Sequence, residues 1–176
     1  MDSVRKRSAT ERLAGLFDAH HERLFRLACR LASDREEARD LVQEAFLRAA
    51  QHPGSLPEGE RPGEAWLVRT LVNLCRDRYR RLGVRTRVHA SLRREEGSAH
   101  PENAAVIGTT VRTALGRLAP RRRAAIVLHE LEGAPVREVA RLLGIAEVTV
   151  RWHLLAARRE LARVFGTENR GTEDQK

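Results

Sequence analysis

The segment from Leu118 to Phe165 constrains the fold most narrowly, because it joins two helical apolar patterns through a glycine turn. The apolar positions are Val136, Val139, Ala140 and Leu143 in the first pattern and Val150, Leu154, Ala157 and Leu161 in the second. Gly144 supplies the left-handed backbone conformation that ends a helix, and the second helix begins near Glu147. This order predicts a helix-turn-helix motif, which is typical of DNA-binding proteins.

The outward face of the second predicted helix carries basic residues together with a tryptophan. Residues in the first turns of a recognition helix meet base edges, whereas later basic residues meet phosphates. We therefore assign base reading to Glu147, Val148, Thr149, Arg151 and Trp152, and phosphate anchoring to Arg158 and Arg159. Trp152 can be interpreted in two ways. Either its indole packs on a thymine methyl group or a sugar of DNA, or the residue belongs to the core of a simple amphipathic helical hairpin.

Composition agrees with a nucleic-acid partner without requiring one. The 176 residues contain 33 Lys and Arg against 24 Asp and Glu, a formal net charge of +9. Such a balance favours polyanions but also occurs on many solvated surfaces. Only 4% of the residues are aromatic, so a core must rely on Leu, Val and Ala, and two small helical domains fit this chain best.

The sequence predicts neither a membrane span nor a reactive centre. No apolar run reaches the roughly 20 residues that cross a bilayer, and Met1 to Ser8 lacks an apolar core, so we expect a cytoplasmic protein without membrane insertion. Cys29 and Cys75 are interpreted as reduced, buried thiols, with a redox switch as the alternative. The sequence has no Cys/His set with metal spacing, no nucleophile with a base and no phosphate-cradling glycine loop. We therefore expect no metal, no cofactor and no enzymatic activity.

The N-terminal half predicts three helices. The first spans Ala9 to Ala32, and the third spans Glu64 to about Leu82. The second starts with a capping box at Ser33 or Asp34 and continues to about Ala50. The run from His52 to Gly63 holds many Pro and Gly residues and predicts a loop. The predicted organisation is all-α, with a first domain over 9–83, a flexible linker over 84–104, a four-helix C-terminal domain over 105–166 and a disordered tail over 167–176.

Three strings in a fixed order resemble a known family. They are Asp40 to Phe46, Trp66 to Arg81, and the set formed by Leu118 to Pro120, Glu138 to Ala140 and Thr149 with Val150. Their order and separation are similar to those of bacterial RNA polymerase sigma factors of the extracytoplasmic-function (ECF) type, which contain regions 2 and 4 only. The resemblance covers about residues 10 to 165 and implies an alternative sigma factor that directs transcription initiation. The alternative is a helix-turn-helix regulator that acts without being a polymerase subunit.

The resemblance implies that the first string binds the clamp helices of the polymerase β′ subunit. The implied contact residues are Asp40, Leu41, Gln43, Glu44 and Phe46. Their acidic and amide groups would pair with basic residues, and Leu41 and Phe46 would add apolar contact. An ordinary solvated helix face is the alternative. The polymerase β flap, promoter DNA and an anti-sigma factor are the other implied partners.

The resemblance also implies that the second string melts the promoter at the minus ten element, while the recognition helix reads the minus thirty-five element. The implied minus ten residues are Arg69, Asn73, Arg76, Asp77, Arg80 and Arg81. Contacts to a base edge and to phosphates would offset the cost of holding an unstacked base. The loop from His52 to Gly63 would shape the wall of this pocket. Asp77 could instead pair with Arg80 or Arg81 as an ordinary helix ion pair.

Overall fold

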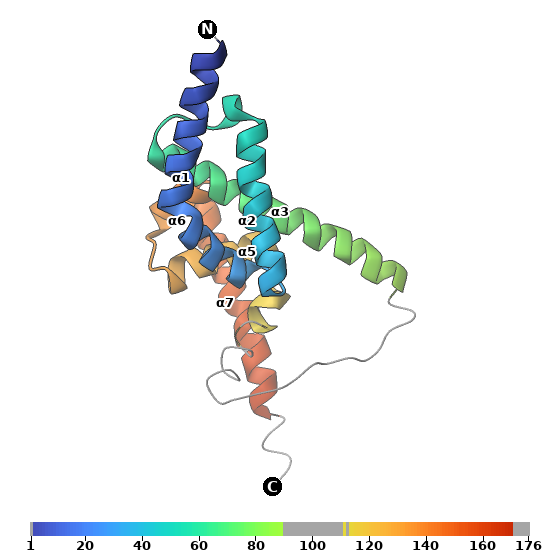
Figure 1. The fold of residues 1–176 in the computed structure, drawn as a ribbon. Coiled ribbons are helices and arrows are strands. Elements are labelled where there is room, and N and C mark those ends of the chain that lie inside the picture. The colour runs from blue at the N-terminus through green and yellow to red at the C-terminus, as the bar shows by residue number, and fades with distance from the viewer. Residues whose placement is uncertain (1, 90–110, 112, 171–176) are drawn as a thin grey trace.

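The protein consists of helices in two groups that pack together (Figure 1). The computed structural model describes residues 2–89, 111 and 113–170. The first group comprises α1 (Asp2–Leu31), α2 (Arg35–Gln51), the short 3-10 helix η1 (Pro53–Ser55) and α3 (Glu60–His89). The second comprises α5 (Pro120–Ile126), the π-helical segment η2 (Val127–Leu131), α6 (Val136–Leu143) and α7 (Glu147–Arg170). No strand occurs within the described residues, and the all-α prediction is confirmed.

The three long helices of the first group share an aliphatic core. α2 begins after Asp34, whose carboxylate accepts a hydrogen bond from the Glu37 amide at 2.7 Å, while the Glu37 carboxylate accepts one from the Ser33 amide at 2.7 Å. This reciprocal cap confirms the predicted helix start. The fully buried leucines of this core are Leu27 of α1, Leu41 of α2, and Leu67 and Leu71 of α3. In Figure 1, α1 and α2 run side by side, and α3 crosses them steeply and projects beyond the bundle.

The start of α3 differs from the prediction. The helix begins at Glu60. Pro62 is compatible with this start, because it lies in the first turn, where a missing N–H costs no hydrogen bond. Gly63 does not interrupt the helix. It allows α3 to lie close to Leu16 of α1, since a Cβ on Gly63 would come within 2.8 Å of Leu16 Cδ1. The loop predicted for 52–63 is therefore shorter than expected and contains η1.

Several helices are longer than the apolar patterns indicate. α1 begins at Asp2, α3 continues to His89 and α7 continues to Arg170. The rest of the predicted linker, 90–104, lies outside the described residues, and so does the rest of the predicted tail, 171–176. None of the described helices is both long and apolar enough to cross a membrane.

The second group has the predicted helix-turn-helix geometry. Gly144 ends α6 in the left-handed conformation, with φ 65° and ψ 41°, and the Ile145 amide donates to the Ala140 carbonyl at 3.1 Å. Leu142 is fully buried although it lies outside the predicted apolar set, because α6 packs against α3 of the first group as well as α7. Of the helix predicted for Val106 to Leu118, residues 111 and 113–117 are described and helical.

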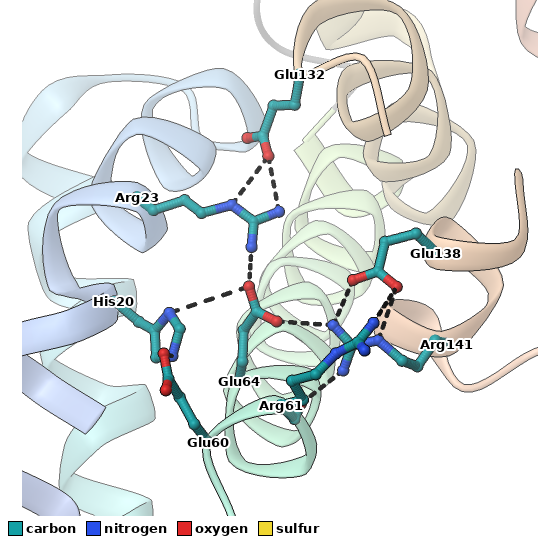
Figure 2. Close-up of polar contacts among 8 residues, drawn as sticks. All are labelled: His20, Arg23, Glu60, Arg61, Glu64, Glu132, Glu138 and Arg141. Atoms are coloured by element: carbon teal, nitrogen blue, oxygen red, sulfur yellow. Dashed lines mark hydrogen bonds and ion pairs between the residues drawn. The ribbon is translucent and has the colours of Figure 1, made fainter. Parts of the chain in front are cut away.

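The two groups form one continuous core. α3 contacts α5 and α6, and α1 contacts α5 and η2. The cluster of buried apolar residues accordingly extends through both groups. The groups therefore meet through a definite interface. Glu64 of α3 pairs there with Arg23 of α1 and Arg141 of α6 (Figure 2). Arg23 also pairs with Glu132, directly after η2.

Candidate nucleic-acid interface

The outer face of α7 presents the residues that were predicted to read bases. The helix starts at Glu147, directly after the Gly144 turn, and exposes Val148 and Trp152 by 69% and 55%. Arg151 is exposed as well, and Glu147 and Thr149 are half-buried. The predicted anchoring residues, Arg158 and Arg159, are exposed farther along the same helix. The first turns of α7 thus offer an apolar and basic surface of a kind that suits a DNA groove.

Trp152 lies on the surface, so its interpretation as a core residue is wrong. The guanidinium of Arg122, from α5, lies over its ring at 5.1 Å from the centroid, and the His153 ring meets it at 5.1 Å. Burial, followed by the nearby Arg122 and Arg121, lowers the pKa of His153. Trp152 therefore packs against a cation that α5 contributes.

Two arginines of α7 pair with carboxylates of the same chain. Arg151 Nη2 lies 3.0 Å from Glu147 Oε2, and Arg158 Nε lies 3.1 Å from Glu130 Oε1. The hydrogen bond from Arg158 lowers the pKa of Glu130. Because exposed ion pairs contribute little free energy, phosphates could displace both carboxylates readily.

The six residues predicted for the minus ten element occupy α3 in two different settings. Arg69 and Asn73 are half-buried and line a cavity of about 180 Å³ together with Arg121, Leu143, Gly144 and Ile145 of the second group. Arg80 and Arg81 are exposed. Asp77 pairs with its neighbour Arg76 at 3.4 Å, rather than with Arg80 or Arg81 as the alternative interpretation expected. The second group therefore covers one end of the predicted DNA face.

Four of the five residues predicted to bind polymerase line an open cavity of about 440 Å³ beside α2, whereas the fifth, Phe46, is buried and lines a neighbouring groove. Asp40 and Gln43 are exposed, whereas Leu41 is 1% exposed and contributes to the core and the cavity floor. Arg78 of α3 lies 3.7 Å from Asp40, and Arg48 lies 3.0 Å from Glu44. The acidic groups are thus accessible, although arginines partly neutralise them.

An apolar groove between α1 and α2, which sequence analysis missed, adjoins this cavity. It encloses about 550 Å³, and its walls include Phe17, Phe25, Val42 and Phe46. Phe17 and Leu47 are 44% and 46% exposed. Gln43 and Leu47 line both the groove and the cavity. The apolar residues of α1 form a stripe broader than one neighbouring helix can cover, and this was the available signal for an exposed groove. They include Leu13, Leu16, Phe17, Leu24 and Phe25.

Two family models match the chain, one over each helical group. Residues 16–85 match sigma-70 region 2, and residues 109–161 match sigma-70 region 4. The ECF RNA polymerase sigma factor SigM of Mycobacterium tuberculosis is 36% identical over 158 residues, which cover 89% of this chain and 78% of SigM. The chain belongs to the ECF sigma factors. The first helical group is region 2 and the second is region 4 of an alternative sigma factor that directs transcription initiation.

Other known proteins agree with this assignment. The ECF sigma factor SigL of Mycobacterium tuberculosis is 35% identical over 152 residues, covering 85% of this chain and 86% of SigL. The fold resembles the sigma factor RpoE solved with the anti-sigma factor NepR from Bartonella quintana, with a TM-score of 0.62, 24% identity and coverage of 89% and 96% of the two chains. It also resembles CnrH solved with the cytosolic domain of CnrY, with a TM-score of 0.64, 24% identity and coverage of 93% and 96%.

Cys75 of the sigma factor is expected to resist alkylation. Burial, assisted by the Glu37 carboxylate, raises the pKa of its thiol to about 12. The thiolate is the reactive form, so Cys75 stays protonated and inert at mildly alkaline pH, whereas the half-buried Cys29 is accessible. Iodoacetamide labelling followed by peptide mass spectrometry should find label on Cys29 in the native chain, and on both cysteines after unfolding. Rapid native labelling of Cys75 would contradict the burial described.

Proposed function

We propose that this sigma factor binds core polymerase through α2 and the apolar groove beside it. Asp40, Gln43 and Glu44 would pair with basic side chains of the β′ clamp helices, and the exposed Phe17 and Leu47 would add apolar contact. The observation that carries this proposal is the continuity of an acidic surface with an apolar groove on one face of region 2. A helix that presents both basic and apolar residues fits such a face.

Promoter recognition is assigned to two separate helices. α7 would read the minus thirty-five element with Val148, Arg151 and Trp152, and region 4 would also contact the polymerase β flap. α3 would hold the minus ten strand through Arg76, Arg80 and the neighbouring minus ten residues. This division suits a factor that contacts DNA at two places while mounted on polymerase.

We extend the proposal to the setting in which the sigma factor works. An anti-sigma factor is the expected inhibitor, because the sigma factor RpoE, which has a similar fold, was solved in complex with the anti-sigma factor NepR. Because it would act together with polymerase, the protein would work in the cytoplasm. It would contribute contacts rather than catalysis, so the nucleotidyl transfer would belong entirely to the polymerase.

Run-off transcription tests this function directly. Core polymerase with and without the sigma factor is supplied with a library of upstream fragments, and specific transcripts are expected only when both proteins are present. Comigration of the sigma factor with core polymerase in gel filtration provides the second measurement. A chain that fails to comigrate and yet binds operators tightly by itself would instead act as a helix-turn-helix regulator without polymerase.

A further inference from the structure

The exposed tryptophan of α7 packs against an arginine that comes from a different helix. The guanidinium of Arg122, from α5, lies over the Trp152 ring at 5.1 Å from its centroid, within the range of a cation–π contact. Most of the Arg122 side chain is covered, whereas Trp152 is exposed. The indole is therefore held on the side of α5 and offers the rest of its surface to a ligand.

A carboxylate of α7 fixes this arginine in place. Glu160, about two turns beyond Trp152, forms an ion pair with the Arg122 guanidinium, and both side chains are only partly exposed. Trp152, Ala156 and Glu160 recur every four residues, so they follow one ridge of α7. The small side chain of Ala156 leaves room for a guanidinium that contacts both of the others. Arg122 thus has little freedom to move away from the indole.

His153 restricts the indole from another direction. Its ring centroid lies 5.1 Å from that of Trp152, with 63° between the two ring planes. The His153 side chain is half-buried, and burial lowers the pKa of its ring, so the ring is mostly neutral near neutral pH. The indole is therefore flanked by two side chains, of which Arg122 supplies the charge.

The surface around the indole is apolar. Val148 lies four residues before Trp152 and Leu155 three residues after it, so all three share one face of α7, and all three are exposed. Among the groups that base edges present in the major groove, the C5-methyl group of thymine is the apolar one. This face of the helix therefore suits thymine better than any other base.

We propose that Arg122, anchored by Glu160, positions the indole of Trp152 against a thymine methyl group of the minus thirty-five element and thereby sets the base preference of α7. The thymine contact rests on the proposed function of Trp152, whereas the contact between Arg122 and the indole does not. An unsupported side chain on a helix surface samples several rotamers. Fixing one rotamer before DNA binds reduces the entropy that is lost on binding. Arg122 is thus a positioning residue that acts through Trp152.

Fluorine NMR of the full chain, labelled with 5-fluorotryptophan, tests the positioning. The chain contains two tryptophans and should give two resonances, which Trp152→Phe assigns. Arg122→Ala should move the Trp152 resonance toward its position in the unfolded chain, while the Trp66 resonance of region 2 stays in place. Arg122→Lys should preserve part of the original shift, since it keeps a cation near the ring. An unchanged Trp152 resonance in Arg122→Ala would overturn the positioning.

Two further variants make the NMR measurement specific. Glu160→Ala releases the arginine without altering α5, so it should move the Trp152 resonance in the same direction by a smaller amount. Arg117→Ala is the matched control, because Arg117 is an exposed arginine of region 4 that carries the same charge. It should leave both resonances unchanged. Circular dichroism checks that each variant keeps its helices.

Replacing single thymines of the minus thirty-five element by uracil tests the base preference. The probe is a promoter identified by run-off transcription, and it is bound by core polymerase that carries the sigma factor. Uracil lacks only the methyl group, so one replacement should weaken wild-type binding about fourfold, the factor expected for burying one methyl group. Arg122→Ala and Trp152→Ala should both bring this ratio close to one, whereas Arg117→Ala should retain it.

The ratio of the two affinities separates positioning from a simple loss of charge. Removing a phosphate contact weakens binding to thymine and uracil promoters equally, so it leaves the ratio unchanged. An Arg122→Ala variant that keeps the wild-type ratio would refute the inference. If no uracil replacement weakens the wild type and Trp152→Ala binds normally, base reading by Trp152 is wrong, although the NMR result would still establish that Arg122 holds the indole.

Discussion

Replacing both Asp40 and Glu44 by alanine should nearly abolish transcription that depends on this sigma factor. Both carboxylates lie at the open cavity on α2, where they can reach basic side chains of a partner. Truncating charged partners at a protein interface commonly costs about 2 kcal/mol or more, which corresponds to roughly a thirtyfold loss of affinity. Pull-down with core polymerase measures the affinity, and run-off transcription measures its consequence.

A matched variant separates this contact from a general effect of charge. Glu36→Ala combined with Glu58→Ala removes the same two negative charges from exposed positions of region 2 that lie outside the cavity. This control should keep its affinity for polymerase. Equal affinities of the Asp40/Glu44 variant and the wild type would show that the acidic face of α2 is merely solvated.

Replacing Arg76 and Arg80 by alanine should prevent promoter opening while sparing polymerase binding. Neither residue lines the cavity that Arg69 and Asn73 share with region 4. Loss of contacts between arginine and nucleic acid costs about 1–3 kcal/mol each, and we expect at least a tenfold decrease in open complex. Permanganate footprinting detects the unpaired thymines, and gel filtration confirms assembly with polymerase.

Arg26→Ala is the appropriate control for these arginines. Arg26 is an exposed arginine of region 2 that pairs with Glu22 along α1. It lies on a different helix from the proposed strand contacts, so its removal should leave the footprint unchanged. Persistent thymine reactivity in the Arg76/Arg80 variant would remove both residues from promoter melting.

The helix-turn-helix motif was predictable because its signals are local. Gly144 adopts the left-handed conformation that a helix end of this kind requires, and α6 runs between the predicted residues. Asp34 likewise caps α2 through neighbours in sequence. Such features depend on the chemistry of a few adjacent residues, so the amino-acid order alone identifies them.

The contacts between the two regions were not predictable in the same way. Glu64 and Arg141 are 77 residues apart, and Arg23 and Glu132 are 109 apart. No periodicity within a helix indicates which arginine faces which carboxylate across such distances. Leu142 was missed for the same reason, because it is buried by the docking of α6 between two neighbours.

The candidate polymerase-binding and DNA-binding surfaces could be predicted only in part. The three strings located the helices that carry the polymerase and promoter residues, but they did not show that Leu41 points into the core. They also did not show that the stripe of α1 leaves Phe17 half exposed beside Phe46, with ring centroids 4.9 Å apart. Exposure depends on what the neighbouring helices leave uncovered, and this becomes known only once the bundle is assembled.

The π-helical segment η2 gives region 4 a place where the chain can change its length by one residue and keep its angular register. A π turn accommodates one residue more than an α turn, and each residue of an α-helix advances the chain by about 100° around the axis. Because both kinds of turn complete one revolution, deleting a single residue between Val127 and Leu131 would restore regular winding and leave Glu132 on the side that faces Arg23 of α1. Relatives of the protein can therefore be one residue shorter at this position without moving either DNA-facing helix.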